Sequence, residues 1–364
     1  METQVKAAIA SSNYKQAGTL LKQWQAKDAK NPLLRFYAAQ LQEQTNRLDA
    51  AEKNYTKLLQ QSTHRKIITQ ARAGIERIRQ QRKAQKAAEL EQARAVSGAQ
   101  DVAILAIAAP PETHKKDAIA AVAKVFSIDA YTARMKVPSS GFRIHRVGPW
   151  GELSYLQQQL NQSTAPAFCA KVDDIKALQT FQISHFEALS PQPTVICKNA
   201  DGQLGKISFS WSEVTQSVRG QVPIFEQVAD VGNWGKTVHK EKVQDYAQVV
   251  DLHLPGREIV LRVCDRLYQY KQGVELGSAS ETNSRIKWNQ LIKTFSEATQ
   301  ISFQDDFSRF GKSTLEFINL LPVIHPNLDI DRREPSDWDL AFHLYSSLCY
   351  TSQPAPIRQG TIVV

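Results

Sequence analysis

Cysteine is scarce in this chain of 364 residues, and long apolar runs are missing. Its four cysteines form no C-x-x-C pair and have no histidine nearby at metal-ligand spacing: Cys169, Cys197, Cys264 and Cys349. This pattern argues against a disulfide scaffold or a zinc module and favours buried thiols in a reducing compartment. The best apolar run, Val102 to Pro111, has the length of a strand and not the ~18 residues of a membrane-spanning helix.

Other classes of protein are disfavoured by composition. The first twenty residues have no apolar stretch of the kind found in signal peptides, so we expect a cytoplasmic protein with no membrane partner. An apolar fraction of 42% is too high for a disordered chain, and 16 Gly with 15 Pro exclude collagen-like or low-complexity sequence. The length predicts two or three domains, each with its own core.

Motifs of catalysis are also missing. The sequence contains no G-x-G-x-x-G, H-E-x-x-H or G-x-S-x-G pattern, and its eight histidines are scattered. The segment FGKST resembles the end of a phosphate-binding loop, but Asp306 stands where that loop needs glycine, and Ser313 with Glu316 fits a capping box at a helix start. We therefore predict that the protein is not an enzyme and needs no cofactor or metal.

An acidic cluster lies in LDIDRREPSDWD, where Asp-x-Asp could hold a divalent metal. Its acids are Asp329, Asp331, Glu334, Asp337 and Asp339. We favour a helix start at Ser336, with ion pairs to Arg332 and Arg333, over a metal site.

Basic residues outnumber acidic ones by 45 to 36, which gives a net charge of +9 and favours an anionic partner. Six of these nine charges lie between His64 and Arg94, where nine Lys or Arg residues face three acids. We favour a solvated helix here over a nucleic-acid site, because no aromatic residue is interleaved with the charges.

Residues 1–97 are rich in helix formers and show a repeat with an offset of 34 residues. The equivalent pairs are Ala17 with Ala51, Leu21 with Tyr55, Trp24 with Leu58, and Ala39 with Ala73. The units NYKQAGTLLKQW and RLDAAEKNYTKLL resemble the tetratricopeptide repeat (TPR). The resemblance covers about two repeats, and a third helix pair is expected from Thr63 to Ala95 because such repeats need neighbours to bury their faces.

The pattern changes after Val96–Gln100, which we take as a domain boundary. The predicted class is α+β, with N-terminal TPR-like helical hairpins followed by an α/β-plus-β globular module that ends in helices. We expect an α/β ligand-binding unit over 101–190, a β-rich unit over 191–275 and a helical part over 276–364 that packs with 101–275 as one module. Pro255-Gly256 marks a hairpin within the β-rich unit.

Cations and small hydroxyls gather around the turn PSSG. The candidate ligand-binding residues are Arg134, Lys136, Ser139, Ser140, Phe142, Arg143, His145, Arg146 and Trp150. Arginine forks bind phosphate and the guanine edge bidentately, aromatic rings stack on bases, and hydroxyls take the remaining oxygens. The alternative, surface charges on an ordinary strand, stays open. We interpret a second group, Arg257, Arg262 and Arg266, as solvated strand faces.

Three blocks carry a further resemblance: YTARMKVPSSGFRIHRVG, DYAQVVDLHLPGREIVLRVCDRLYQYKQG and RREPSDWDLAFHLYSSL. With the TPR-like N-terminus, they resemble a family of cyanobacterial soluble proteins that includes a cyclic-di-GMP receptor. The resemblance implies a non-enzymatic second-messenger receptor whose bound state alters a protein partner, a transcriptional regulator being one candidate. A homodimer stays open, and nucleic acid is not favoured as a partner. The alternative is a constitutive TPR-type scaffold or an RNA-associated protein that uses the basic helix 63–95.

Overall fold

The computed structural model describes residues 1–231, 237–277, 283–332 and 336–352. The chain divides into two compact units, Met1–Gln92 and Ala93–Val364, which we call the helical unit and the mixed unit. The predicted boundary at Val96–Gln100 lies shortly after this division. Among the described residues, no helix combines the length and the apolar character that crossing a bilayer requires.

The helical unit consists of five successive helices, the last of which runs to the start of the mixed unit. The prediction of a third helix pair from Thr63 to Ala95 is wrong, because a single long helix covers this stretch. The five helices are α1 (Glu2–Ala10), α2 (Tyr14–Lys27), α3 (Pro32–Gln44), α4 (Leu48–Gln61) and α5 (Arg65–Arg94). Asparagine caps begin two of them: Asn13 accepts from the backbone N–H of Gln16, and Asn31 accepts from that of Leu33. Helices α2 and α3 therefore begin where a side-chain cap in the sequence favours a helix start.

Three of the four 34-residue pairs are buried at both positions, with Ala17, Ala51 and Tyr55 fully inaccessible. The fourth is wrong: Ala39 is buried, but Ala73 is exposed. The small residues that α5 buries are Ala71 and Gly74. A Cβ on Gly74 would lie 2.6 Å from the Tyr55 ring, so this glycine leaves room on α5 for the Tyr55 side chain of α4.

The mixed unit has two sheets. The strands of the smaller sheet are β1 (Val102–Ala108), β2 (Phe142–Pro149) and β3 (Ala167–Lys171). Those of the larger sheet are β4 (Gln179–Ala188), β5 (Thr194–Lys198), β6 (Leu204–Ser208), β7 (Gln216–Val231), β8 (Thr237–Leu254), β9 (Ile259–Cys264) and β10 (Phe303–Gln304). Its α-helices are α6 (Lys115–Phe126), α7 (Ala130–Lys136), α8 (Trp150–Gln162), α9 (Val172–Ala177), α10 (Ser284–Thr299), α11 (Phe307–Ile318) and α12 (Asp337–Thr351).

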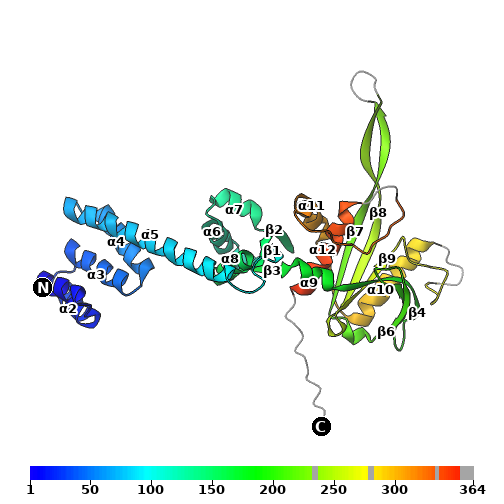
Figure 1. Cartoon of the computed structure of the whole chain (residues 1–364), viewed down its shortest axis with the longest axis horizontal. Helices are drawn as coiled ribbons and strands as arrows, with labels where there is room; N and C mark the ends of the chain where they lie inside the picture. The colour runs from blue at the N-terminus through cyan, green and yellow to red at the C-terminus, as the bar shows by residue number, and fades with distance from the viewer. Residues whose placement is uncertain (232–236, 278–282, 333–335, 353–364) are drawn as a thin grey trace, which may run out of the picture. The chain divides into compact units, whose positions relative to one another are not determined.

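The sheets and helices of this unit form layers (Figure 1). The smaller sheet has the order β2-β1-β3 and is antiparallel throughout. Helices α6, α7 and α8 pack on one of its faces, through Leu105 and Ile107. Its other face, through Ile104 and Ile144, shares a core with α11, α12 and the larger sheet, and α10 packs on the far face of the larger sheet.

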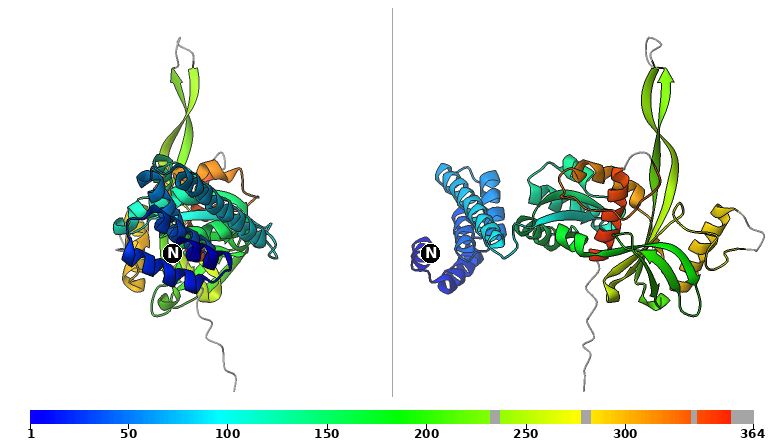
Figure 2. Two further views of the ribbon diagram at one scale, coloured as in Figure 1. Left: turned by 90° about the vertical axis from the view of Figure 1, so that its left-hand side faces the viewer. Right: turned by 45° about the vertical axis from the view of Figure 1, so that its right-hand side comes forward.

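The larger sheet has the order β10-β7-β8-β9-β4-β5-β6. The α/β unit predicted for 101–190 thus does not keep all of its strands, because β4 pairs in parallel with β9 and antiparallel with β5. Strands β7 and β8 extend beyond their neighbours as a two-stranded arm, visible in Figures 1 and 2. The prediction missed this arm, whereas the hairpin at Pro255-Gly256 is confirmed by the short 3-10 turn between β8 and β9.

One predicted helix start is wrong. Ser313 does not open a helix, since α11 already begins at Phe307 and the Ser313 hydroxyl donates to the Phe310 carbonyl in mid-helix. The predicted loop Gly277–Ser284 lies mostly outside the described residues.

Candidate functional site

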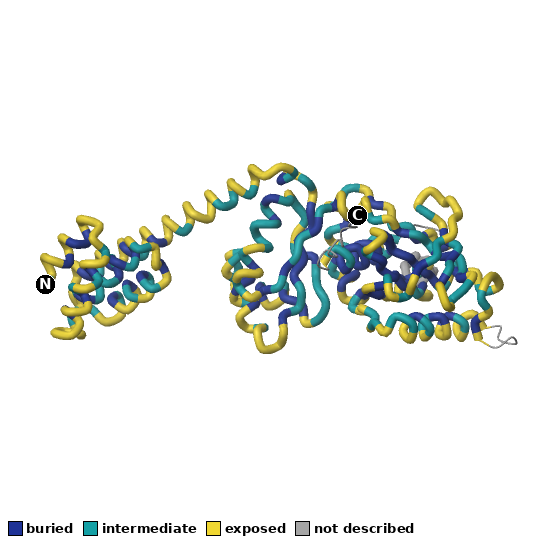
Figure 3. The backbone as a smooth tube through the Cα atoms, turned by 90° about the horizontal axis from the view of Figure 1, so that it is seen from below, coloured by how far each residue is buried: buried dark blue, intermediate teal, exposed yellow. Residues whose placement is uncertain are grey.

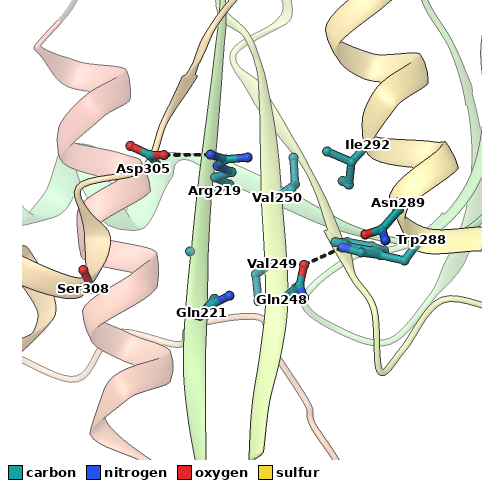
Figure 4. Close-up of a pocket in the computed structure, with 11 residues that line it drawn as sticks. Arg219, Gln221, Gln248, Val249, Val250, Trp288, Asn289, Ile292, Asp305 and Ser308 are labelled. Carbon is teal, nitrogen blue, oxygen red and sulfur yellow. Dashed lines mark hydrogen bonds and ion pairs between the residues drawn. The ribbon is translucent and has the colours of Figure 1, made fainter. Parts of the chain in front are cut away.

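A cavity of about 390 Å³, lined by polar and apolar side chains, lies where the larger sheet narrows to the β7–β8 arm. On one side β10 stops after its pairing of Gln304 with Val218, and on the other β9 stops after Cys264, opposite Val249. The residues of β7 after Val218 therefore have no strand on their outer side, and on β8 Gln248 is bonded to Asp265, which follows the end of β9. Helix α10 forms a wall, and the chain around Asp305 and Ser308 forms the rim (Figure 4).

Two fixed contacts frame this cavity (Figure 4). Arg219 on β7 donates to Asp305 at 2.7 Å, with its guanidinium 5.4 Å from the centre of the Phe303 ring. On the opposite wall the buried Trp288 donates its Nε1–H to Gln248 at 2.7 Å. The cavity thus has a charged end and an aromatic end, both held in place by the protein.

Three further polar side chains line the cavity and are exposed: Gln221, Asn289 and Ser308. Within the described parts of the chain, no protein group hydrogen-bonds these three side chains. Amides and hydroxyls donate and accept, Asp305 accepts, and Arg219 matches phosphate or a base edge. The volume lies in the range of about 300–1,000 Å³ that small-molecule sites occupy.

The sequence-predicted residues around PSSG are placed differently. The Ser140 hydroxyl donates to Asp306 at 2.7 Å and accepts from Arg309, so the loop is attached to the start of α11. Gly141 has a positive φ of 58°, and a Cβ there would lie 2.9 Å from that of Asp306. Ser140 is thus already bonded to a carboxylate and a guanidinium, while Ser139 is exposed.

The two rings predicted to stack on bases, those of Phe142 and Trp150, lie at opposite ends of β2. Phe142, at the start of β2, lies in an aromatic cluster with Phe168, Phe310 and Tyr345, at centroid distances of 5.0 to 5.5 Å. Trp150 follows the other end of the strand, with the Lys171 ammonium 5.4 Å from its ring centre. One ring is therefore part of the core, and the other already has a cation beside it.

His145 is turned inward at the β-bulge of β2, with its ring 4.0 Å from that of Phe126. Burial, with the nearby charges of Lys136, Arg146 and Arg143, lowers the pKa of His145 to about 4. The imidazole is neutral at pH 7, and the cations that lower its pKa are gathered around it.

The predicted cations are only partly available. Arg143 donates to the Met135 carbonyl at 3.0 Å, and Arg146 pairs with Glu152 at 3.1 Å. Arg134 is exposed and Lys136 is half-buried on the last turn of α7. The structure adds Arg309 to this neighbourhood, a residue that no local pattern associates with the loop.

Within the second arginine group Arg257 and Arg266 are exposed, but Arg262 is not a solvated residue. Arg262 is fully buried and forms two hydrogen bonds to Asp251, at 2.8 and 2.7 Å. Arg257 pairs with Glu213 at 2.5 Å, and Arg266 pairs with Asp245. The prediction for Arg262 is wrong. Asp251 on the neighbouring strand neutralises the charge of Arg262, and this pairing offsets the desolvation cost of burying it.

The acidic cluster forms a helix start, as predicted. Ser336 accepts from the backbone N–H of Trp338 at the N-terminus of α12, and Arg332 pairs with Asp339. Glu334 and Arg333 lie outside the described residues. No group of three potential metal ligands occurs in the described ranges.

None of the residues that line the cavity was predicted as a site residue, because they are isolated in the sequence. Arg219, Gln248, Trp288 and Asp305 come from four segments, and none belongs to a recognisable motif. Comparison with known proteins gives no guide either, since the chain matches no family model, no curated protein and no solved structure.

Proposed function

We propose that this protein is a non-enzymatic receptor for an anionic nucleotide, with cyclic-di-GMP as the ligand that the sequence resemblance implies. The observation that carries this proposal is the cavity between α10 and the β7–β8 arm, where Arg219 and Asp305 stand opposite Trp288. A carboxylate and a guanidinium complement the edge of guanine, and a cation also suits its phosphate. The exposed amides of Gln221 and Asn289 can supply further hydrogen bonds.

The proposal includes a protein partner for the helical unit. Its helices pack in succession, and buried small residues repeat at Ala17 and Ala51, which supports the TPR-like interpretation. A ligand changes partner affinity only if it binds the two states unequally, by ~1–3 kcal/mol in typical cases. We place this receptor in the cytoplasm.

Calorimetric titration of the full chain tests the ligand. Cyclic-di-GMP should bind more tightly than cyclic-di-AMP, cyclic GMP or GTP, and should raise the melting temperature by mass action. If none of the four binds, the nucleotide-receptor proposal is wrong.

Two sets of variants locate the site. Arg219→Met and Asn289→Ala should each weaken binding at least about tenfold, since truncation leaves a ligand group unpaired. Arg143→Ala and Arg146→Ala remove cations of the sequence-predicted site and should leave affinity unchanged. The reverse result would move the site to the PSSG loop and exclude the cavity.

A further inference from the structure

The charge of the protein is concentrated in one unit. Residues 1–92 contain 17 of the 45 Lys and Arg residues but only 8 of the 36 Asp and Glu residues, so the helical unit carries the whole net charge of +9. The mixed unit is neutral by the same count. A surplus of this kind, confined to 92 residues, favours a partner of opposite charge on the helical unit.

The basic residues of α5 lie on two different faces of the helix, one toward α3 and α4 and one toward solvent. Arg77 donates to Glu43 at 2.7 Å, and Arg82 lies 2.6 Å from both Asp49 and Glu52. These two arginines bind α5 to α3 and α4 and are therefore engaged within the unit.

Five of the seven remaining basic residues form an outward line, which we call the α5 stripe. Its members are Arg65, Arg72, Arg79, Lys83 and Lys86, all of them exposed. Four are seven residues apart and the fifth is four residues after Arg79, so all lie within about 60° of one helix face and span roughly 32 Å. Apart from the 3.9 Å contact of Arg79 with Glu76, no ion pair joins them to any part of the chain that the structure describes.

The second half of α5 offers a surface for another helix. After Ile78 no residue of α5 is buried, and Figure 3 shows this stretch mainly in the exposed colour. Ala73, Ala84 and Ala87 are exposed on the flank of the stripe, and small residues permit close approach of a second helix.

We propose that the α5 stripe binds an acidic helical segment of a protein partner, with carboxylates that repeat every seven residues. Charges seven residues apart on two parallel or antiparallel helices meet at the same spacing, as in coiled coils. Nucleic acid fits less well, because α5 has no aromatic residue for base stacking. In addition, the phosphate backbone of a duplex winds around its axis, so a straight line of cations can contact it over only a short distance. This inference names the partner class of the proposed receptor and rests on that part of the proposal.

The test uses two synthetic peptides of 28 residues and equal composition, with glutamates on one helical face or spread around the helix. Fluorescence anisotropy with the full chain should show tighter binding of the one-face peptide. Gln at all five stripe positions should weaken it at least about tenfold, because five exposed pairs that are individually weak are lost together. Gln has a helix propensity close to that of Arg and Lys, so the fold should persist, as circular dichroism can verify.

A matched control removes the same number of charges elsewhere in the unit. Gln at Lys15, Lys22, Lys27, Lys53 and Lys57, which are exposed on α2 and α4, should change affinity less than twofold. Equal weakening by both variants, or equal binding of both peptides, would overturn the proposal. Stripe-dependent binding of a 24-base-pair RNA duplex, tighter than that of the peptide, would overturn it in favour of nucleic acid.

These measurements need no nucleotide, so they are independent of the cavity. If the protein binds cyclic-di-GMP but does not bind the one-face peptide, only the proposal for the α5 stripe is rejected. Peptide binding without nucleotide binding would support the stripe and reject the nucleotide receptor.

Discussion

The two units of this protein handle charge in opposite ways. The helical unit has a large surplus of positive charge, and its basic residues lie on the surface. Its one buried charged residue among those described is Glu43, which accepts hydrogen bonds from Arg77 and Tyr55. The mixed unit has no net charge, yet it buries an arginine and an aspartate completely. Surface charge is available to partners, whereas buried charge restricts how the chain can pack.

The buried network lies between α12 and the larger sheet. Arg262 binds Asp251, donates to the Pro326 carbonyl and lies 5.1 Å from the ring centre of Phe342. His253 lies between Gln216 at 3.0 Å and Ser346 at 2.9 Å. Strands β8 and β9, helix α12 and the segment before it are thus joined by polar contacts that only one arrangement satisfies.

The largest expected effect comes from breaking this pair. Arg262→Met leaves Asp251 buried without its partner and should lower the free energy of unfolding by roughly 3–5 kcal/mol. Arg257→Met removes one partner of a partly exposed pair with Glu213 and should cost less than about 1 kcal/mol. Urea unfolding, with hydrogen exchange to assign the loss to the mixed unit, measures both. Equal losses would show that burial does not distinguish the two pairs.

The second-largest expected effect is a difference between the two units in their loss of stability at acidic pH. Burial lowers the pKa of His253 to about 4 and that of His343 to about 3, below the ~6.5 of an unfolded chain. The folded state therefore binds fewer protons, and stability present at neutral pH is lost as the pH falls through 6.5 toward 4. Between pH 7 and 5 these two histidines together should cost the mixed unit up to roughly 4 kcal/mol.

Two comparisons test the origin of this loss. His343 has a buried Nδ1 without a partner among the described residues and faces the charges of Arg262 and Asp251. His343→Leu should therefore flatten the pH dependence of hydrogen exchange in the mixed unit. The helical unit, whose single histidine is the exposed His64, should show no comparable loss. A loss of equal size in both units would contradict this origin.

Two glycines probe packing in the helical unit. Gly74→Ala places a methyl group 2.6 Å from the Tyr55 ring, which Glu43 holds by a 2.7 Å hydrogen bond, and should cost about 1–3 kcal/mol. Gly18→Ala meets its nearest atom at 3.9 Å and should stabilise α2 by about 0.5–1 kcal/mol. Thermal unfolding measures the two changes, and the same sign for both would refute the packing argument.

The smallest expected effect is that of salt. Raising NaCl from about 20 to 500 mM screens the surplus charge and should stabilise the helical unit by a few tenths of a kcal/mol, with less change in the mixed unit. Hydrogen exchange resolved by peptide can follow both units in one sample. Destabilisation of the helical unit by salt would mean that its ion pairs outweigh its repulsion.

Prediction succeeded where structure depends on neighbours in the chain. Ser336 caps α12 by accepting from the backbone N–H of Trp338, and Pro255-Gly256 lies in the turn between β8 and β9. The β7–β8 arm was missed because Pro223 interrupts a polar strand, and proline normally argues against a long strand. The bonding of the predicted loop site could not be foreseen for another reason: Asp306 and Arg309 approach Ser140 from more than 160 residues away.

By itself, the sequence determined the helical character of residues 1–92, the helix caps, and the confinement of the surplus charge to one part of the chain. These follow from local propensity, short-range hydrogen bonds and composition. Tertiary structure alone decided that Arg262 is buried and that β4 belongs to the larger sheet. It also decided that Arg219, Trp288 and Asp305 border one cavity. Strand pairing and desolvation depend on partners distant in the chain, which no local pattern specifies.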